Sequence, residues 1–129
     1  MTERAYVLLV DDDPIQTEVG RIMLERLGCE VAIACNGLEA IELCKRRVYD
    51  LILMDQNMPV MDGPQATAAI RELAPPFRTV PIIATASTGT VHGSQQLGMD
   101  DFLGKPFTIS AVKAVLANWS SGKYDRPTA

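Results

Sequence analysis

The stretch at residues 50–55, Asp-Leu-Ile-Leu-Met-Asp, decides the fold, because four consecutive apolar residues end in an acid. A run of this length that is apolar on both faces is typical of a parallel strand with helices on both sides. Working outward, three more short apolar runs end in polar residues: residues 7–10 before Asp11, Asp12 and Asp13, residues 82–84 before Thr85, and residues 102–104 before Lys105. The carboxyl ends of parallel strands meet at one edge of a sheet, so we expect these polar groups to share one crevice.

Helix signals separate the apolar runs. After Pro14, a helical spacing of apolar residues predicts a helix with one inward stripe, made by Ile15, Val19, Ile22, Met23 and Leu27. Further helices are expected over 38–47, 64–73 and 109–119, and Gly89 and Gly93 predict a short or irregular helix before the fifth strand. Strands are expected at 6–10, 29–35, 50–54, 80–84 and 101–104. The alternation predicts an α/β fold, a doubly wound, flavodoxin-like parallel sheet of order 2-1-3-4-5. One domain would cover residues 4–119, followed by a polar tail at 120–129.

Composition narrows the class of protein. The net charge of −4 argues against binding to nucleic acid through phosphate contacts. No apolar run reaches the length of about 18 residues that a membrane helix needs. Three cysteines without metal-ligand spacing, and no secretory signal, predict reduced and buried thiols in a cytoplasmic protein.

The clustered acids predict a metal and phosphate chemistry. A site built from carboxylates, without sulfur or imidazole, selects a hard divalent ion, and Mg²⁺ is the expected cofactor. One of the acids could then attack a phosphoryl group and form an acyl phosphate. The ammonium of Lys105 and the hydroxyl of Thr85 would stabilise the phosphoryl oxygens.

Three motifs in order resemble the receiver domain of two-component response regulators: residues 8–14 (Leu-Leu-Val-Asp-Asp-Asp-Pro), residues 50–63 ending in Met-Asp-Gly, and residues 98–107 with Lys105-Pro106. The resemblance implies that Asp55 is the phosphoacceptor and that Mg²⁺ is bound by Asp12 directly, by Asp11 mainly through water, by Asp55, and by the backbone carbonyl of Asn57. It also implies that Lys105 contacts the phosphoryl group and precedes a cis peptide bond to Pro106. Phe102 falls at the aromatic switch position, although an aromatic residue there could simply be part of the core.

The same resemblance implies partners. The phosphodonor would be a histidine kinase or a histidine phosphotransfer protein, and a downstream protein target would read the phosphorylated state. Nucleic-acid binding and membrane insertion are not expected. The chain would be a signalling phosphoacceptor and no enzyme beyond self-phosphotransfer and slow autodephosphorylation. Met1 and the short tail favour a stand-alone protein, and a receiver cut from a hybrid kinase is the alternative.

The register of the fourth strand leaves open which residue supplies the hydroxyl group beside the phosphoryl site. The pair Thr85-Ala86 is the recognisable motif, but it comes one residue early when counted from Pro81. Counting from Pro81 puts Ala86 in the hydroxyl position, and a slip of one residue turns a side chain to the other face of a sheet. We expect Thr85 to supply the hydroxyl, with Ser87 in reserve.

Two other functions compete with phosphoacceptance. A receiver fold could act as an interaction module without phosphorylation. A true phosphatase or phosphotransferase would instead turn over phosphoesters through an aspartyl phosphate. Against the second of these, no further acid is evidently placed as a general acid or base.

Overall fold

A five-stranded parallel sheet forms the centre of the molecule, with the strands in the order β2-β1-β3-β4-β5. The computed structural model describes residues 4–56, 58, 61–73, 75–86 and 98–119. The strands are β1 (Tyr6–Val10), β2 (Glu30–Ala34), β3 (Leu51–Asp55), β4 (Ile82–Ala86) and β5 (Asp101–Gly104). The helices are α1 (Pro14–Arg26), α2 (Gly37–Arg46), α3 (Gly63–Arg71), α4 (Pro76–Thr79) and α5 (Ile109–Trp119). The predicted fold class and strand order are confirmed.

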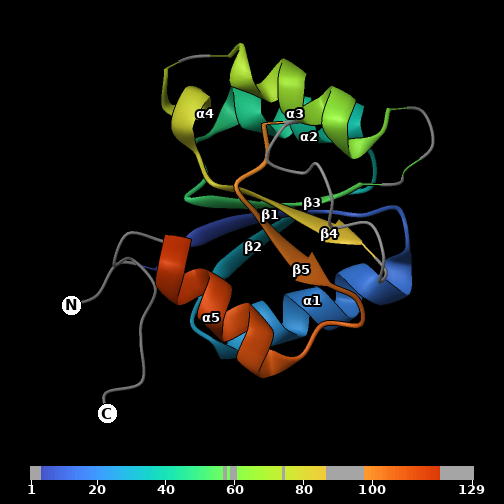
Figure 1. Cartoon of the computed structure of the whole chain (residues 1–129), viewed down its shortest axis with the longest axis vertical. Coiled ribbons are helices and arrows are strands. Elements are labelled where there is room, and N and C mark those ends of the chain that lie inside the picture. The colour runs from blue at the N-terminus through green and yellow to red at the C-terminus, as the bar shows by residue number, and fades with distance from the viewer. Residues whose placement is uncertain (1–3, 57, 59–60, 74, 87–97, 120–129) are drawn as a thin grey trace.

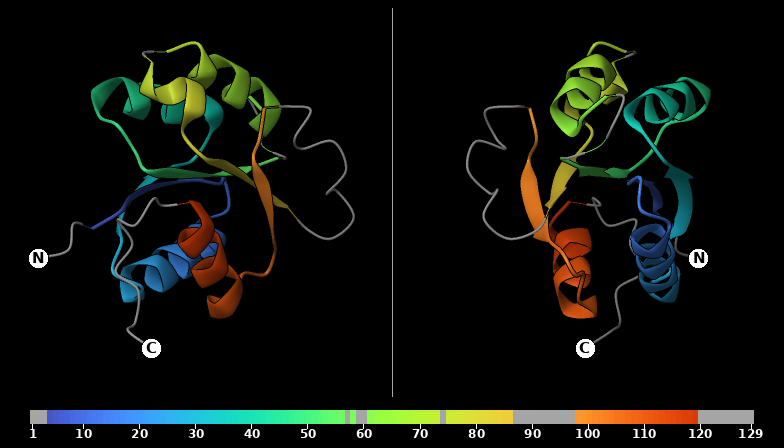
Figure 2. Two further views of the ribbon diagram at one scale, coloured as in Figure 1. Left: turned by 60° about the vertical axis from the view of Figure 1, so that its left-hand side comes forward. Right: turned by 90° about the vertical axis from the view of Figure 1, so that its right-hand side faces the viewer.

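Helices cover both faces of the sheet. α1 and α5 lie on one face, and α2, α3 and α4 lie on the other (Figures 1 and 2). Each face buries its own apolar cluster, and β3 is buried along its whole length. Ile52 and Met54 of this strand enter the cluster beneath α2 and α3, while Leu51 and Leu53 enter the cluster beneath α1 and α5. A strand with apolar residues on both faces is therefore buried on both faces, as expected for the centre of a covered parallel sheet.

The inward face of α1 differs from the prediction. Ile15, Val19 and Ile22 of the expected stripe are exposed, and only Met23 and Leu27 pack against the core. The buried residues of α1 are Thr17, Gly20 and Leu24. A Cβ at Gly20 would lie 2.8 Å from a methyl group of Leu9, so the helix approaches the sheet closely through its small residues. The face of α1 that carries Gly20 is therefore the buried face.

Side-chain caps start four of the helices, including α5, where Oγ1 of Thr108 accepts a hydrogen bond from the N–H of Ala111 at 3.2 Å. Asp13 caps α1 by accepting a hydrogen bond from the backbone N–H of Ile15, and Asn36 caps α2 in the same way. Asp62 and Gln65 form a reciprocal capping box at the start of α3. These caps satisfy N–H groups that have no partner within the helix.

Some predicted boundaries were wrong. β3 and β4 run one and two residues further than expected, to Asp55 and Ala86. The prolines at 75 and 76 follow the end of α3 and also begin the short helix α4, with Pro75 at its N-cap and Pro76 as its first residue. This agrees with the tolerance of the first helical turn for proline. The predicted irregular helix before β5 and the tail at 120–129 lie outside the described residues. No helix in the described part of the chain is long and apolar enough to cross a membrane.

Candidate phosphoryl and metal site

A pocket of about 510 Å³ opens at the carboxyl edge of the sheet. Its lining residues come from the ends of four segments of chain: Asp11, Asp12, Asp13, Pro14, Asp55, Ala86 and Lys105. Asp11 directly follows β1, Asp55 ends β3, and Lys105 directly follows β5. The parallel arrangement thus brings together residues that are far apart in the sequence. Asp11, Asp12, Asp55 and Lys105 meet where the sequence predicted.

The three acids form one cluster. Carboxylate oxygens of Asp11, Asp12 and Asp55 all lie within 4.8 Å of one another. Asp11 and Asp55 are buried, whereas Asp12 is exposed. Three negative charges at such distances repel one another, and the repulsion is strongest between the two buried groups because water screens them least. The cluster therefore needs positive charge.

Lys105 supplies part of that charge. Its Nζ lies 2.7 Å from Oδ2 of Asp11 and 3.2 Å from Oδ1 of Asp55. Burial lowers the pKa of Lys105, but the short contact with Asp11 and the charges of Asp55 and Asp11 outweigh it, so its pKa is raised. The ammonium thus stays charged at neutral pH. The peptide bond from Lys105 to Pro106 is cis, as the resemblance implied.

The cluster has the donor set of a magnesium site. Oδ1 of Asp11 accepts a hydrogen bond from the N–H of Asp13 at 2.9 Å. Oδ2 of Asp11 is buried and has no directed hydrogen bond among the described residues, so its 2.7 Å approach to Lys105 is an ion pair of poor hydrogen-bond geometry. A buried carboxylate oxygen beside two other carboxylates is suited to a small hard cation. Asp11, Asp12 and Asp55 could hold Mg²⁺. Asn57, the fourth expected ligand, lies outside the described residues.

The end of β4 presents Ala86 to the pocket. Thr85 lies opposite Asp55 in the register of β3 and β4, but its side chain is completely buried and is absent from the pocket lining. Its Oγ1 has no hydrogen-bond partner among the described residues. Ala86 therefore lines the pocket here, and the expected role of the Thr85 hydroxyl toward a phosphoryl group stays a prediction. The reserve candidate, Ser87, lies outside the described residues.

Phe102 lies on the other face of the sheet from Asp55. It is partly buried and packs against the apolar cluster beneath α2 and α3. One of its ring carbons would lie 3.6 Å from a Cβ at Gly104. This position agrees with the packing interpretation, and its role as a switch stays a prediction.

A close approach of α3 to the site was missed from the sequence. A Cβ at Gly63 would lie only 2.3 Å from the backbone carbonyl oxygen of Asp55. The N–H of Gly63 also donates to the carbonyl oxygen of Gln56 at 3.3 Å. Gly63 therefore lets the first turn of α3 press against the segment that carries Asp55. The only signal in the sequence was the position of this glycine at the end of the loop before Pro64.

The fold and this acidic pocket define a doubly wound α/β protein with a candidate cation site at its switch point. The sequence profile of the response regulator receiver domain matches residues 7–117. The chain belongs to this family.

Individual relatives agree with the assignment. The chain is 36% identical to two-component response regulator 24 of Arabidopsis thaliana over an alignment of 110 residues. This alignment covers 84% of this chain and 79% of that protein. It is 33% identical over 116 residues to hybrid signal transduction protein dokA of Dictyostelium discoideum, covering 90% of this chain but spanning only 7% of that relative.

A solved structure is similar as well. The receiver domain of sensor histidine kinase PA1611 from Pseudomonas aeruginosa is 36% identical, with a TM-score of 0.84, over 92% of this chain and 98% of that chain. That receiver holds a magnesium ion coordinated in its active site cleft.

Proposed function

We propose that this receiver domain accepts a phosphoryl group on Asp55 in a magnesium-dependent reaction. One observation carries the proposal: the buried carboxylate of Asp55 lies in one pocket with Asp11 and Asp12, and the Nζ of Lys105 is 3.2 Å from it. The phosphodonor is the phosphohistidine of a histidine kinase or of a histidine phosphotransfer protein. Phosphorylation then changes contacts with a downstream protein.

In the proposed step, a carboxylate oxygen of Asp55 attacks the phosphorus atom. A P–O bond forms and the P–N bond of the phosphohistidine breaks, and the leaving nitrogen keeps the electron pair of that bond while the ring takes up one proton to depart as neutral imidazole. Bound magnesium supplies positive charge to the phosphoryl oxygens. Lys105 already contacts Asp55 and would pair with one of those oxygens as negative charge moves onto them. Asp11 and Asp12 would hold the cation.

The face of α1 beside the pocket supports a docking position for the phosphodonor. Ile15, Val19 and Ile22 are 71%, 37% and 40% exposed, and their spacing places them on one side of the helix. This apolar stripe begins one residue after Pro14, which lines the pocket. An apolar surface so close to Asp55 would be covered when a donor protein brings its histidine to the pocket.

Intact mass after treatment with acetyl phosphate tests phosphoacceptance. The wild-type chain should gain the mass of one phosphoryl group in Mg²⁺ and should not gain it in EDTA. Asp55→Asn should not gain this mass in either condition. The control variant Asp62→Asn makes the same acid-to-amide change outside the cluster and should behave as the wild type.

Two results would contradict the proposal. Modification of Asp55→Asn to the same extent as the wild type would place the acceptor elsewhere. A wild-type chain that stays unmodified in Mg²⁺ with both acetyl phosphate and a phosphorylated phosphotransfer protein would favour an interaction module that works without phosphorylation.

A further inference from the structure

A second hollow, of about 390 Å³, lies far from the phosphoryl site. It is formed between the end of α2 and the segment that runs from α3 into α4. Its lining residues are Cys44, Lys45, Arg46, Arg47, Val48, Leu73 and Phe77. α2 begins near the carboxyl edge of the sheet and runs back along it (Figure 2), so its last residues, which line this hollow, lie toward the amino edge.

The interior of the hollow is apolar. Cys44 and Phe77 are buried and belong to the core cluster, while Leu73 packs against that cluster and stays partly exposed. Val48 is 55% exposed. Burial raises the pKa of the Cys44 thiol to about 12, so this side chain is neutral at physiological pH and acts as part of the apolar surface. The hollow can therefore take an aliphatic or aromatic side chain.

Positive charge surrounds this apolar surface. Lys45, Arg46 and Arg47 are consecutive and exposed and line the hollow, and the Nζ of Lys45 forms an exposed ion pair with Oε2 of Glu42 at 3.2 Å. Three of the 12 Lys and Arg residues thus line this hollow in a chain whose net charge is −4. Lysine and arginine at the end of a helix interact favourably with its dipole, which accounts for cations at the end of α2. The dipole does not account for an open apolar hollow between them.

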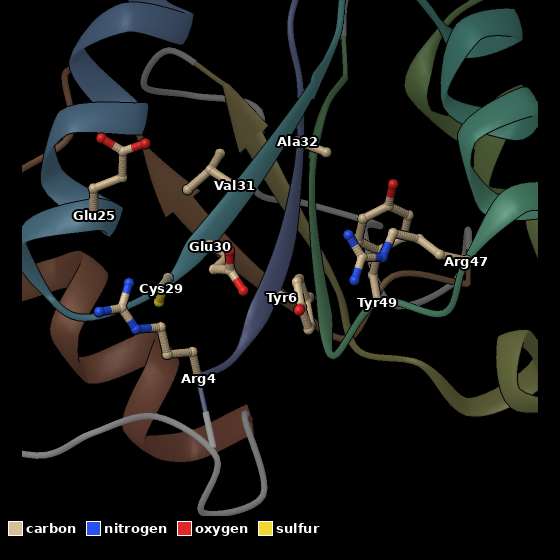
Figure 3. Close-up of a pocket in the computed structure, with 9 residues that line it drawn as sticks. All are labelled: Arg4, Tyr6, Glu25, Cys29, Glu30, Val31, Ala32, Arg47 and Tyr49. Carbon is tan, nitrogen blue, oxygen red and sulfur yellow. The ribbon is translucent and has the colours of Figure 1, made fainter. Parts of the chain in front are cut away.

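One of these cations is held in place. The guanidinium of Arg47 lies 3.7 Å from the ring centroid of Tyr6 and 5.9 Å from that of Tyr49 (Figure 3). Arg47 also lines an adjoining hollow beside β2, so it stands between the two. Stacking on aromatic rings fixes the position of a guanidinium while leaving its N–H donors available to carboxylates.

We propose that this basic-rimmed hollow, defined by residues 44–48, Leu73 and Phe77, binds an acidic peptide segment of a partner protein that inserts one apolar side chain. The carboxylates of the segment would pair with Arg46 and Arg47, and with Lys45 in exchange for its exposed ion pair with Glu42. The apolar side chain would cover Val48 and Leu73. A concave surface receives an inserted side chain, whereas a membrane is bound by apolar residues that protrude. The site is independent of phosphorylation and would hold a partner while Asp55 reacts at the other edge of the sheet.

Amide NMR titration of the full chain with the blocked tripeptide Asp-Phe-Glu tests the proposal. Shifts should concentrate at Cys44, Val48 and Leu73. The double variant Lys45→Glu with Arg46→Glu should weaken binding about fivefold or more, since each exposed ion pair contributes modestly. A matched control, Arg26→Glu with Lys113→Glu, makes the same change in net charge at exposed positions of α1 and α5 and should leave binding unchanged.

A second variant separates the apolar contribution. Val48→Asp changes a residue that is more than half exposed, so the fold should survive, and it should also weaken binding. Shifts that avoid the hollow, or affinities that are equal in the double variant and the wild type, would overturn the proposal. The proposal would also be overturned, in favour of a membrane-binding surface, by two results together. The tripeptide would cause no shifts, and the wild-type chain would float with phosphatidylserine vesicles while the Lys45 and Arg46 double variant would not.

Discussion

Asp12→Asn should stabilise the fold when no divalent cation is present. The Asp12 carboxylate lies within 4.8 Å of the carboxylates of Asp11 and Asp55. At this distance each like-charged pair costs ~0.9 kcal/mol at the dielectric constant of water and ~3.5 kcal/mol at an effective value of about 20. Asp12 is exposed, so the lower figure applies. Removing the charge of Asp12 removes two repulsions of this size and one attraction to Lys105. The free energy of unfolding should therefore rise by ~1 kcal/mol.

Magnesium should reverse the order of stability. A cation at about one hundred times its dissociation constant stabilises the wild type by ~2.7 kcal/mol, and Asp12→Asn should lose most of this because it loses a ligand. Urea unfolding followed by far-UV circular dichroism, in EDTA and in MgCl₂, measures both effects. In thermal unfolding, ~1 kcal/mol corresponds to about 4 °C for a chain of this length.

The neighbouring residue provides a matched control. Asp13 caps α1 and lies outside the cluster of three acids, and asparagine caps helices as well as aspartate does. Asp13→Asn should therefore change stability little in either buffer. If Asp12→Asn is no more stable than the wild type in EDTA, or if Asp13→Asn behaves identically, the electrostatic reasoning fails.

Other changes test packing and exposure. Gly63→Ala places a Cβ against the carbonyl of Asp55 and should lower the free energy of unfolding by ~1–3 kcal/mol, whereas Gly104→Ala makes only an ordinary 3.6 Å contact and should stay close to the wild type in urea unfolding. Leu24→Ala should cost ~2–4 kcal/mol in the same assay because Leu24 is buried, while Ile15→Ala should stay within about 0.5 kcal/mol; equal effects would contradict the assigned face of α1. Of the three thiols, Cys35 alone is exposed and should react with Ellman's reagent in the native state. The two others, whose pKa values burial raises to about 11 and about 12, should react only after unfolding, and rapid native reaction of all three would be contrary to the structure.

Residues at the carboxyl ends of strands were predictable because parallel strands leave little freedom in where their ends meet. Asp11, Asp55 and Lys105 follow from the strand runs alone, since any sheet built from these runs brings them to one edge. Asp12 joins them because it is adjacent to Asp11. The sequence therefore predicted most of the candidate site before any contact was known.

Features that depend on distances between elements were not predictable. The apolar stripe of α1 was taken as its buried face, but Gly20 allows a closer approach on another face and leaves Ile15 exposed. At the end of β4, the residue that lines the pocket depends on where the strand stops, and no periodicity separates Thr85 from Ala86. The buried face of α1 differs from the expected one by a fraction of a helical turn, and the pocket-lining residue of β4 depends on a shift of one residue. Local sequence patterns do not encode differences this small.

The anomalous scattering of Mn²⁺ in crystals of the wild-type chain would test the central claim most directly. Mn²⁺ takes the same oxygen ligands as Mg²⁺ and can be located without reference to the protein atoms. The structure predicts one strong peak within bonding distance of carboxylate oxygens of Asp11, Asp12 and Asp55, with the Nζ of Lys105 in the same pocket. A peak at another acidic surface, with none among these three carboxylates, would contradict the account.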